Sequence, residues 1–272
     1  MQLTIIIGKH SNLSQKIYSF NDKFILISSR EISNDLDVLS QYKDEVVNII
    51  FNNFQTATQL NNLKNINEYI TNTISVTARV LDYFKNTKIN KIIYTSSSSV
   101  YGNNILCKET DEVKPMNLHA SLKLSNEKLI ERYCSDNNID YTITRIFNMY
   151  GGDDNFSVVS KIINAYKSNE KLTIVNKGNA IRDFIYIDDV VSIYIKLLDK
   201  KDVKVLNIGT GCGNSIKGIL HFLSYHDVKI KIKNIYKDEL KISTSDVRLL
   251  NEVIGKYNFI NIEDYLKKEF RL

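Results

Sequence analysis

Four short apolar runs, rich in β-branched residues, set the pattern of the first hundred residues. They occupy residues 3–7, 23–28, 45–51 and 92–94, and each ends in a glycine or a polar cluster. Runs of this length and composition are typical of strands buried on both faces. Between them lie segments that can form helices, including residues 67–84, which have helical apolar spacing. Alternating strands and helices predict an α/β fold built on a parallel sheet.

The alternation continues beyond residue 120 with weaker spacing. Helices are expected over residues 121–133 and 156–167, from Asp188 and from Ile262, and strands over residues 141–147, 171–176, 203–208 and 228–235. We predict a Rossmann-type doubly wound parallel sheet with a smaller C-terminal substrate-binding lobe. Residues 1–150 would form the dinucleotide-binding domain, residues 180–210 would pack back onto it, and residues 151–272 would form most of the lobe.

Charge and hydropathy narrow the class of ligand. The 272 residues carry a net charge of +5, the lysines are spread along the chain, and no zinc or other metal spacing is present. Nucleic acid is therefore not an expected partner, whereas a mildly basic surface suits a phosphorylated small molecule. No apolar stretch of membrane-spanning length and no signal-peptide layout is found, so we expect no membrane partner and a cytoplasmic location.

The first predicted strand leads into the turn GKHSNLSQ, which is a candidate phosphate site. A strand, a tight turn and a helix form the layout in which a helix amino end receives a pyrophosphate. Gly8 alone has the expected glycine spacing, because Ser11 and Ser14 occupy the next two positions. Gly8, Ser11 and Leu13 are the candidate cofactor contacts, and an ordinary strand-to-helix turn is the alternative.

The second predicted strand ends in Ser28, Ser29 and Arg30. An acidic residue at this place binds the ribose 2′-hydroxyl of NAD, whereas an arginine pairs with the 2′-phosphate of NADP. Ser29 and Arg30 therefore favour NADP over NAD, although a solvent-exposed arginine after a strand is also common.

The fourth strand ends in a Thr/Ser cluster at residues 95–99, and the next predicted helix begins beside His119 and Lys123. The carboxyl ends of parallel strands line the ligand crevice of such a sheet. A hydroxyl, an ionisable ring and an amine could therefore meet over one cofactor face.

Five ordered motifs carry a family resemblance. They are TSSSSVYG (95–102), PxxxHxxxK (115–123), RIFNMYG (145–151), RDFIYIDDVV (182–191) and LNIGTG (206–211). Over nearly the whole chain they resemble the extended short-chain dehydrogenase/reductases, in the NAD-dependent epimerase/dehydratase branch that acts on nucleotide sugars. The compact region after the second strand, and GKHSNLSQ, resemble the dTDP-4-dehydrorhamnose reductases, which are NADP-dependent ketoreductases.

The resemblance implies a role for each catalytic candidate. Ser97 would hydrogen-bond the reacting oxygen, with Ser98 as a possible substitute toward the substrate, and Lys123 would bind the nicotinamide ribose. His119 stands where the family has its proton-transferring tyrosine. A histidine already titrates near neutral pH, but the neighbouring Lys123 cation would favour its neutral form. His119 as acid/base, transfer of the role to another group or to water, and loss of redox chemistry stay open.

The same resemblance places the sugar diphosphate near Asn148 and Arg182. A guanidinium suits a pyrophosphate, although an ion pair with Asp183 or Asp188 is the structural alternative. The helices over residues 67–84 and 121–133 resemble those that form a homodimer interface in the family.

The function expected from the sequence is reduction of a 4-keto sugar nucleotide by NADP in deoxysugar or polysaccharide biosynthesis. One alternative is a nucleotide-sugar 4-epimerase or dehydratase with tightly bound NAD. A second alternative, from a different class, is a non-catalytic nucleotide-sugar-binding protein that keeps the fold but has lost the redox pair.

Overall fold

The computed structural model describes residues 2–53 and 66–272. The chain divides into two compact units. The first unit comprises Met1–Val100, Pro115–Arg145 and Val191–Leu206, and the second comprises Tyr101–Lys114, Ile146–Val190 and Asn207–Leu272.

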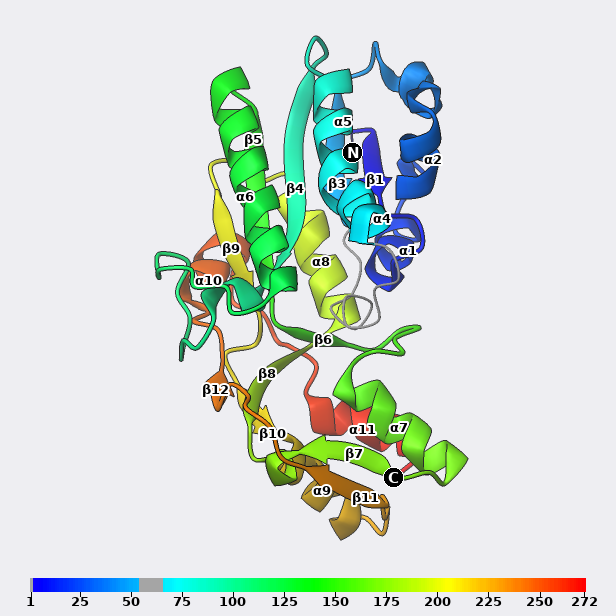
Figure 1. Cartoon of the computed structure of the whole chain (residues 1–272), viewed down its shortest axis with the longest axis vertical. Coiled ribbons are helices and arrows are strands. Elements are labelled where there is room, and N and C mark those ends of the chain that lie inside the picture. Colours follow the sequence, from blue (N-terminus) through cyan, green and yellow to red (C-terminus); the bar gives the residue numbers. More distant parts are fainter. Residues whose placement is uncertain (1, 54–65) are drawn as a thin grey trace. The chain divides into compact units, whose positions relative to one another are not determined.

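A six-stranded sheet with the order β2-β1-β3-β4-β5-β9 is built mainly from strands of the first unit (Figure 1). Its strands are β1 (Thr4–Ile7), β2 (Phe24–Ile27), β3 (Val47–Phe51), β4 (Ile89–Ser97), β5 (Asp140–Ile146) and β9 (Val205–Ile208). β1 pairs in parallel with both β2 and β3, and β3 pairs in parallel with β4. The strand order reverses at β1, so β1 and β3 flank the topological switch point at which such sheets bind ligands. The predicted α/β fold of Rossmann type is confirmed.

The sheet is covered by helices because its strands are apolar on both faces. Every residue of β1 and β3 is buried. α5 and α6 run beside each other over the sheet (Figure 1), and the Tyr133 hydroxyl donates to the Leu81 carbonyl between them. The helices and turns of this part are α1 (Asn12–Tyr18), α2 (Ser29–Asn34), η1 (Leu36–Tyr42), α4 (Ile66–Ile70), η2 (Thr71–Ser75), α5 (Val76–Tyr83), η3 (Ser98–Tyr101), α6 (Leu118–Asn137) and α8 (Ile187–Leu197).

The helix predicted over residues 67–84 is present, but a π turn, η2, interrupts it. The Val76 N–H donates to the Thr71 carbonyl five residues back, where an α-helix would bond four residues back. The Thr73 carbonyl accepts from the side-chain amides of Asn53 and Asn126, each at 3.0 Å. The π turn is therefore joined to the loop after β3 and to α6.

The second unit has its own apolar core, with small sheets packed against helices. β8 pairs in parallel with β6 and β12 and antiparallel with β10, while β11 pairs in parallel with β7. The elements are β6 (Asn148–Tyr150), α7 (Val158–Ser168), β7 (Leu172–Val175), η4 (Asn176–Gly178), β8 (Ile181–Tyr186), β10 (Gly213–Ser215), α9 (Ile216–Tyr225), β11 (Ile232–Ile235), β12 (Ile242–Ser243), α10 (Arg248–Ile254) and α11 (Ile262–Phe270).

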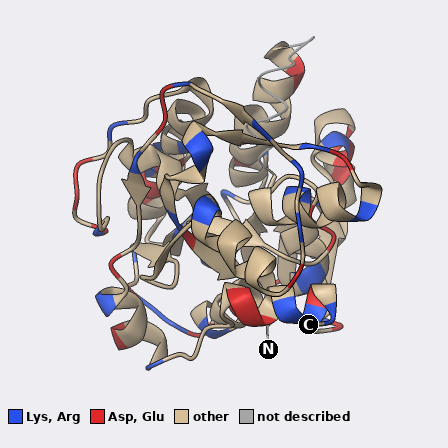
Figure 2. Cartoon of the chain, turned by 90° about the horizontal axis from the view of Figure 1, so that it is seen from below, with Lys and Arg blue, Asp and Glu red and all other residues tan. Residues whose placement is uncertain are grey.

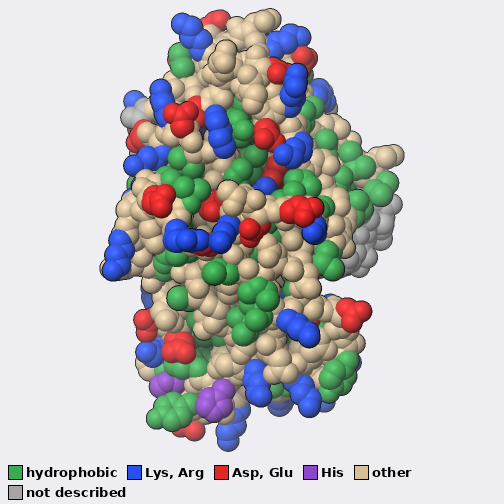
Figure 3. Space-filling model, turned by 90° about the vertical axis from the view of Figure 1, so that its left-hand side faces the viewer, with side chains coloured by type: hydrophobic (Ala, Val, Ile, Leu, Met, Phe, Trp, Pro, Cys, Tyr) green, Lys and Arg blue, Asp and Glu red, His purple; other side chains and the backbone are tan. Residues whose placement is uncertain are grey.

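Basic residues are not concentrated on one element. Figure 2 shows lysines and arginines distributed over helices, strands and loops, and the face in Figure 3 has acidic and basic side chains interspersed. Among residues 2–53 and 66–272, none of the helices combines the length and apolar character needed to cross a bilayer.

Candidate active site

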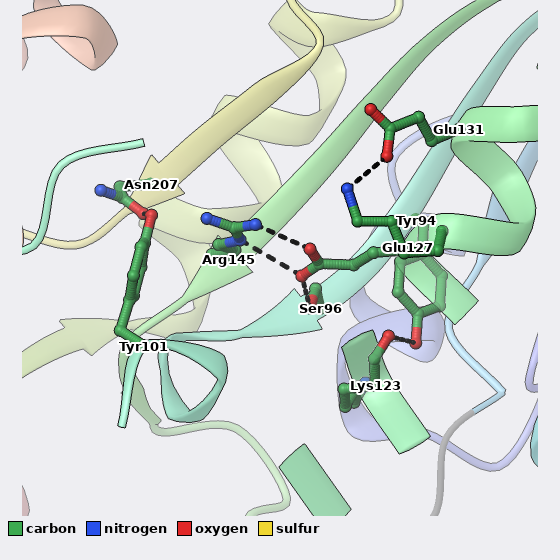
Figure 4. A network of polar contacts seen from close by, with 9 residues as sticks. Tyr94, Ser96, Tyr101, Lys123, Glu127, Glu131, Arg145 and Asn207 are labelled. Carbon is green, nitrogen blue, oxygen red and sulfur yellow. Dashed lines mark hydrogen bonds and ion pairs between the residues drawn. The ribbon is translucent and has the colours of Figure 1, made fainter. Parts of the chain in front are cut away.

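The carboxyl end of β4 carries a buried network of charged and hydroxyl groups. Glu127 reaches from α6 towards Ser96 of β4 and Arg145 of β5 (Figure 4). The Ser96 hydroxyl donates to the Glu127 carboxylate, and Arg145 donates to the same carboxylate from Nε at 3.2 Å and from Nη2 at 2.8 Å. Both charged side chains are nearly fully buried. This bidentate pair ties α6 to the two central strands next to the Thr/Ser cluster.

Ser97 and Ser98 follow Ser96 directly but differ from it in environment. Ser96 is buried, whereas Ser97, the last residue of β4, and Ser98, the first residue of η3, are half-buried. The Ser97 hydroxyl oxygen accepts the Ser99 N–H at 3.2 Å. The Ser96 hydroxyl thus hydrogen-bonds to Glu127 inside the protein, whereas the hydroxyls of Ser97 and Ser98 are partly accessible.

Lys123 lies one helical turn before Glu127 on α6, and its amine reaches the backbone near the carboxyl end of β4. Its Nζ donates to the Thr95 carbonyl at 2.6 Å and lies 5.5 Å from the centre of the Tyr94 ring. The side chain is buried, and this burial lowers the pKa of Lys123 to about 7 against the opposing effect of Glu127. The amine therefore exchanges its proton within the physiological pH range.

His119 lies one turn before Lys123 on the same face of α6. Its ring is half-buried, and Nδ1 lies 3.1 Å from the hydroxyl of Tyr69 in α4. Burial, and secondarily the Lys123 cation, lower the pKa of His119 to about 4. The imidazole is therefore neutral at pH 7.

The turn after β1 meets the end of β3 at the switch point of the sheet. Gly8 has φ +115°, and a Cβ added there would lie 2.3 Å from the Asn52 carbonyl oxygen, so no other residue fits. The Asn52 side-chain amide donates to Ser11 Oγ at 2.8 Å and to Ser14 Oγ at 2.9 Å. Leu13, between these serines, is buried in the core. Its side chain therefore supports α1 from inside.

The end of β2 places Ser29 and Arg30 in the first turn of α2. Ser28 caps this helix, because its hydroxyl accepts the Glu31 N–H while the Glu31 carboxylate accepts the Ser28 N–H. Ser29 is half-buried, and the exposed Arg30 lies 3.6 Å from Glu68.

The two candidate substrate contacts of the second unit lie on neighbouring strands. Asn148 of β6 donates from its amide to the Asp183 carbonyl at 3.1 Å. Arg182 of β8 donates to the carbonyl of Ile181 and lies 3.5 Å from the Glu239 carboxylate, so Glu239 is an ion-pair partner that the sequence did not indicate. Burial lowers the pKa of Arg182.

A model of the NAD dependent epimerase/dehydratase family matches residues 17–209, which is most of the chain. The chain belongs to this family. The matched residues include Ser97, His119, Lys123, Asn148 and Arg182, whereas the turn at Gly8 precedes them.

Relatives of the chain include dTDP-D-glucose 4,6-dehydratase of Dictyostelium discoideum, which is 32% identical over 55% of this chain and 38% of the relative. The putative UDP-glucose 4-epimerase of Methanocaldococcus jannaschii is 28% identical over 80% of this chain and 72% of the relative. The chain thus spans little more than a third of the Dictyostelium protein.

Solved structures share the fold over the full length. UDP-N-acetylglucosamine 4-epimerase of Methanobrevibacter ruminantium aligns with a TM-score of 0.83 and 21% identity, over 99% of this chain and 96% of that structure. UDP-glucuronic acid 4-epimerase of Bacillus cereus, solved with UDP-glucuronic acid and NAD, aligns with a TM-score of 0.81 and 22% identity, over 98% of each chain.

Two residues of this family member were not singled out as site residues from the sequence. Tyr69 was overlooked because it lies on a helix whose apolar spacing was interpreted as core packing. Asn52 follows a buried strand, and the run Asn52–Asn53 was the available signal for a polar group at the switch point.

Proposed function

We propose that this protein is an NAD(P)-dependent oxidoreductase of nucleotide sugars whose reaction begins with oxidation of a sugar hydroxyl, as in a 4-epimerase or a dehydratase. The observation that carries the proposal is the placement of His119 and the buried Lys123 one turn apart on α6, with the Lys123 amine hydrogen-bonded to the Thr95 carbonyl of β4. Burial lowers the pKa of both groups, which favours a neutral imidazole at pH 7. A neutral imidazole accepts a proton from a hydroxyl at its unprotonated nitrogen, whereas it is a much weaker acid towards a ketone than an imidazolium is.

The nicotinamide cofactor fits the groups at the switch point. Gly8, Ser11 and the amino end of α1 would hold the phosphates, Ser29 and Arg30 the adenosine ribose, and Lys123 the nicotinamide ribose. The bound nicotinamide supplies acceptance and return of a hydride. Ser97 would hydrogen-bond the reacting oxygen, while Ser98, Asn148 and Arg182 would contact the nucleotide diphosphate sugar. The protein would act as a homodimer through α5 and α6.

A second candidate is the NADP-dependent reduction of a 4-keto sugar nucleotide in deoxysugar biosynthesis. The observation that favours it is the exposed Arg30 at the start of α2, since a guanidinium there pairs with a 2′-phosphate. Reduction uses exchangeable NADPH, whereas an epimerase retains its NAD through the cycle.

The nicotinamide test separates these candidates. Nucleotide released from the purified protein by acid is identified by chromatography, and the protein is titrated with NAD, NADH and NADPH. Copurified NAD, with epimer or 4-keto product from UDP- or dTDP-hexoses and no net NADH, supports the proposal. Preference for NADPH with turnover of a 4-keto sugar supports the reductase. No binding of any nicotinamide contradicts both enzymes and leaves a non-catalytic nucleotide-sugar binder.

The role of His119 is tested by substitution once a substrate is known. We expect His119→Ala to lower kcat by roughly 10²–10⁴-fold, as for a lost general base, and His119→Tyr to retain turnover because a tyrosine restores the residue of the family. An unchanged kcat in His119→Ala removes His119 from proton transfer. A thermal-shift panel of nucleotide sugars, in which a bound ligand raises the melting temperature, identifies the nucleotide and the sugar.

A further inference from the structure

The hydrogen bond between Tyr69 and His119 joins two elements of the first unit that lie far apart in the sequence. The Tyr69 hydroxyl of α4 lies 3.1 Å from Nδ1 of His119 at the start of α6. Tyr69 has no exposed surface, whereas the His119 ring is half-buried. The phenol is therefore the more buried of the two groups, and the imidazole is the one that solvent or a ligand can reach.

The backbone around Tyr69 is fixed by contacts with the π turn. The Thr73 hydroxyl donates to the Tyr69 carbonyl at 2.7 Å, and Asn126, seven residues after His119 on α6, donates to the Thr73 carbonyl at 3.0 Å. Asn53 donates to the same carbonyl from the loop after β3. The π turn thus links the backbone of Tyr69 to α6 about two turns beyond His119.

A neutral imidazole has two tautomers, and the hydrogen bond at one ring nitrogen decides which of them forms. Burial raises the pKa of Tyr69 well above that of an ordinary tyrosine, so the phenol stays neutral and its oxygen can accept a hydrogen bond. If Nδ1–H donates to this oxygen, the lone pair of the ring lies on Nε2. Proton exchange with a substrate hydroxyl then takes place at Nε2.

We propose that Tyr69 is the positioning residue of this site: by accepting the Nδ1–H of His119, it fixes the orientation of the ring and presents Nε2 as the base. This inference rests on the proposed function. In the oxidation step the substrate O–H bond breaks and its proton moves to Nε2, while the hydride with its electron pair leaves the sugar carbon for the nicotinamide. The Nδ1–H bond to Tyr69 is kept, and both transfers reverse when the hydride returns.

The direct test is the tautomer of His119, measured by ¹⁵N NMR on protein labelled at its four histidines. The His119 signals are assigned by their loss in His119→Gln. We expect the wild-type protein to show Nδ1 protonated and Nε2 unprotonated at pH 7. We expect Tyr69→Phe, which removes only the hydroxyl, to give a mixture of tautomers. Tyr133→Phe is the matched control, because it also removes a tyrosine hydroxyl, one on α6 that donates to the Leu81 carbonyl of α5. We expect this variant to leave the His119 signals unchanged.

The kinetic test follows from the loss of one hydrogen bond. We expect Tyr69→Phe to lower kcat by about 3- to 10-fold with little change in KM, and Tyr133→Phe to leave both constants unchanged.

His119 signals that are identical in Tyr69→Phe and wild type overturn the inference. A wild-type His119 that is protonated at Nε2 and not at Nδ1 also overturns the inference. This measurement uses the wild-type protein alone, so it does not depend on whether a variant folds. Because these spectra require neither cofactor nor turnover, they decide the inference even if no nicotinamide binds and the proposed function fails.

Discussion

Two buried charged groups, Asp183 in the second unit and Lys123 in the first, have opposite surroundings. Asp183 on β8 accepts hydrogen bonds from the backbone N–H groups and hydroxyls of Thr210 and Ser245 and from the N–H of Gly211, at 2.5–3.0 Å. Lys123 donates to the Thr95 carbonyl beside the Tyr94 ring, and burial still lowers its pKa to about 7.

The two sites differ in how far the protein compensates the charge for its lost hydration. The protein surrounds Asp183 with donors that replace its lost hydration, so this aspartate stabilises the turn at residues 209–211 and Ser245. The surroundings of Lys123 leave its charged form disfavoured, which is typical of groups that bind or exchange protons at an active site. Substitutions at the two positions should therefore change stability in opposite directions.

Removal of the Asp183 carboxylate should have the largest effect. Asp183→Ala leaves several buried donors without an acceptor, and we expect the free energy of unfolding to fall by about 3–5 kcal/mol. Urea denaturation followed by circular dichroism measures it. Ser245→Ala, which removes a single hydroxyl donor, is the control and should lose about 1 kcal/mol. A loss below that of Ser245→Ala would mean that Asp183 does not organise this turn.

Replacement of Lys123 by an apolar residue of similar length should do the opposite. Lys123→Met removes a buried amine whose charged form is disfavoured, so we expect the free energy of unfolding to rise by about 1–2 kcal/mol at pH 6 while nicotinamide binding is lost. Between pH 7 and 10.5 the unfolded chain binds more protons at Lys123 than the folded chain does, so the stability of the wild type increases with pH over this range.

The same measurement at several pH values sharpens the comparison. Lys123→Met lacks the titrating amine, so its advantage over the wild type should shrink from pH 7 upwards and be smallest near pH 10. Parallel pH profiles for the two proteins would show that the Lys123 amine is hydrated in the folded state.

The smallest effects are expected at the neighbouring serines of β4. Ser96→Ala removes the buried donor to Glu127 and should lose about 1 kcal/mol of stability. Ser97→Ala changes a half-buried hydroxyl, so we expect less than about 0.5 kcal/mol of stability change but a lower kcat. Thermal unfolding and steady-state kinetics on both variants test this division, and equal stability losses would contradict it.

Most of the fold could be predicted from the sequence, because the strands are continuous apolar runs and the ligand-facing residues follow their ends. The Thr/Ser cluster with Ser97 could be placed at the end of β4 for this reason, and Gly8 in the turn after β1, whereas the role expected of Lys123 on α6 came from the family resemblance. The helix predicted over residues 121–133 is longer in the structure, residues 118–137, because Asn117 caps it and its last turn ends on the left-handed Asn138.

Contacts that depend on tertiary registration could not be predicted in the same way. The Tyr69–His119 pair joins residues fifty positions apart. The π turn, which sets the rotation of α4, left no recognisable break in the helical spacing of apolar residues in the sequence. The partner of Arg182 was equally hidden, since Glu239 follows it by 57 positions, beyond three intervening strands.

The π turn at Thr71–Ser75 contains one residue more than an α-helical turn requires. Loss of one codon within it would restore a regular helix and rotate α4 by about 100° relative to α5. Tyr69 would then leave His119 without any change to either side chain. The partner of the histidine thus depends on the length of this helix, so homologues should be compared by that length before they are compared by residue identity.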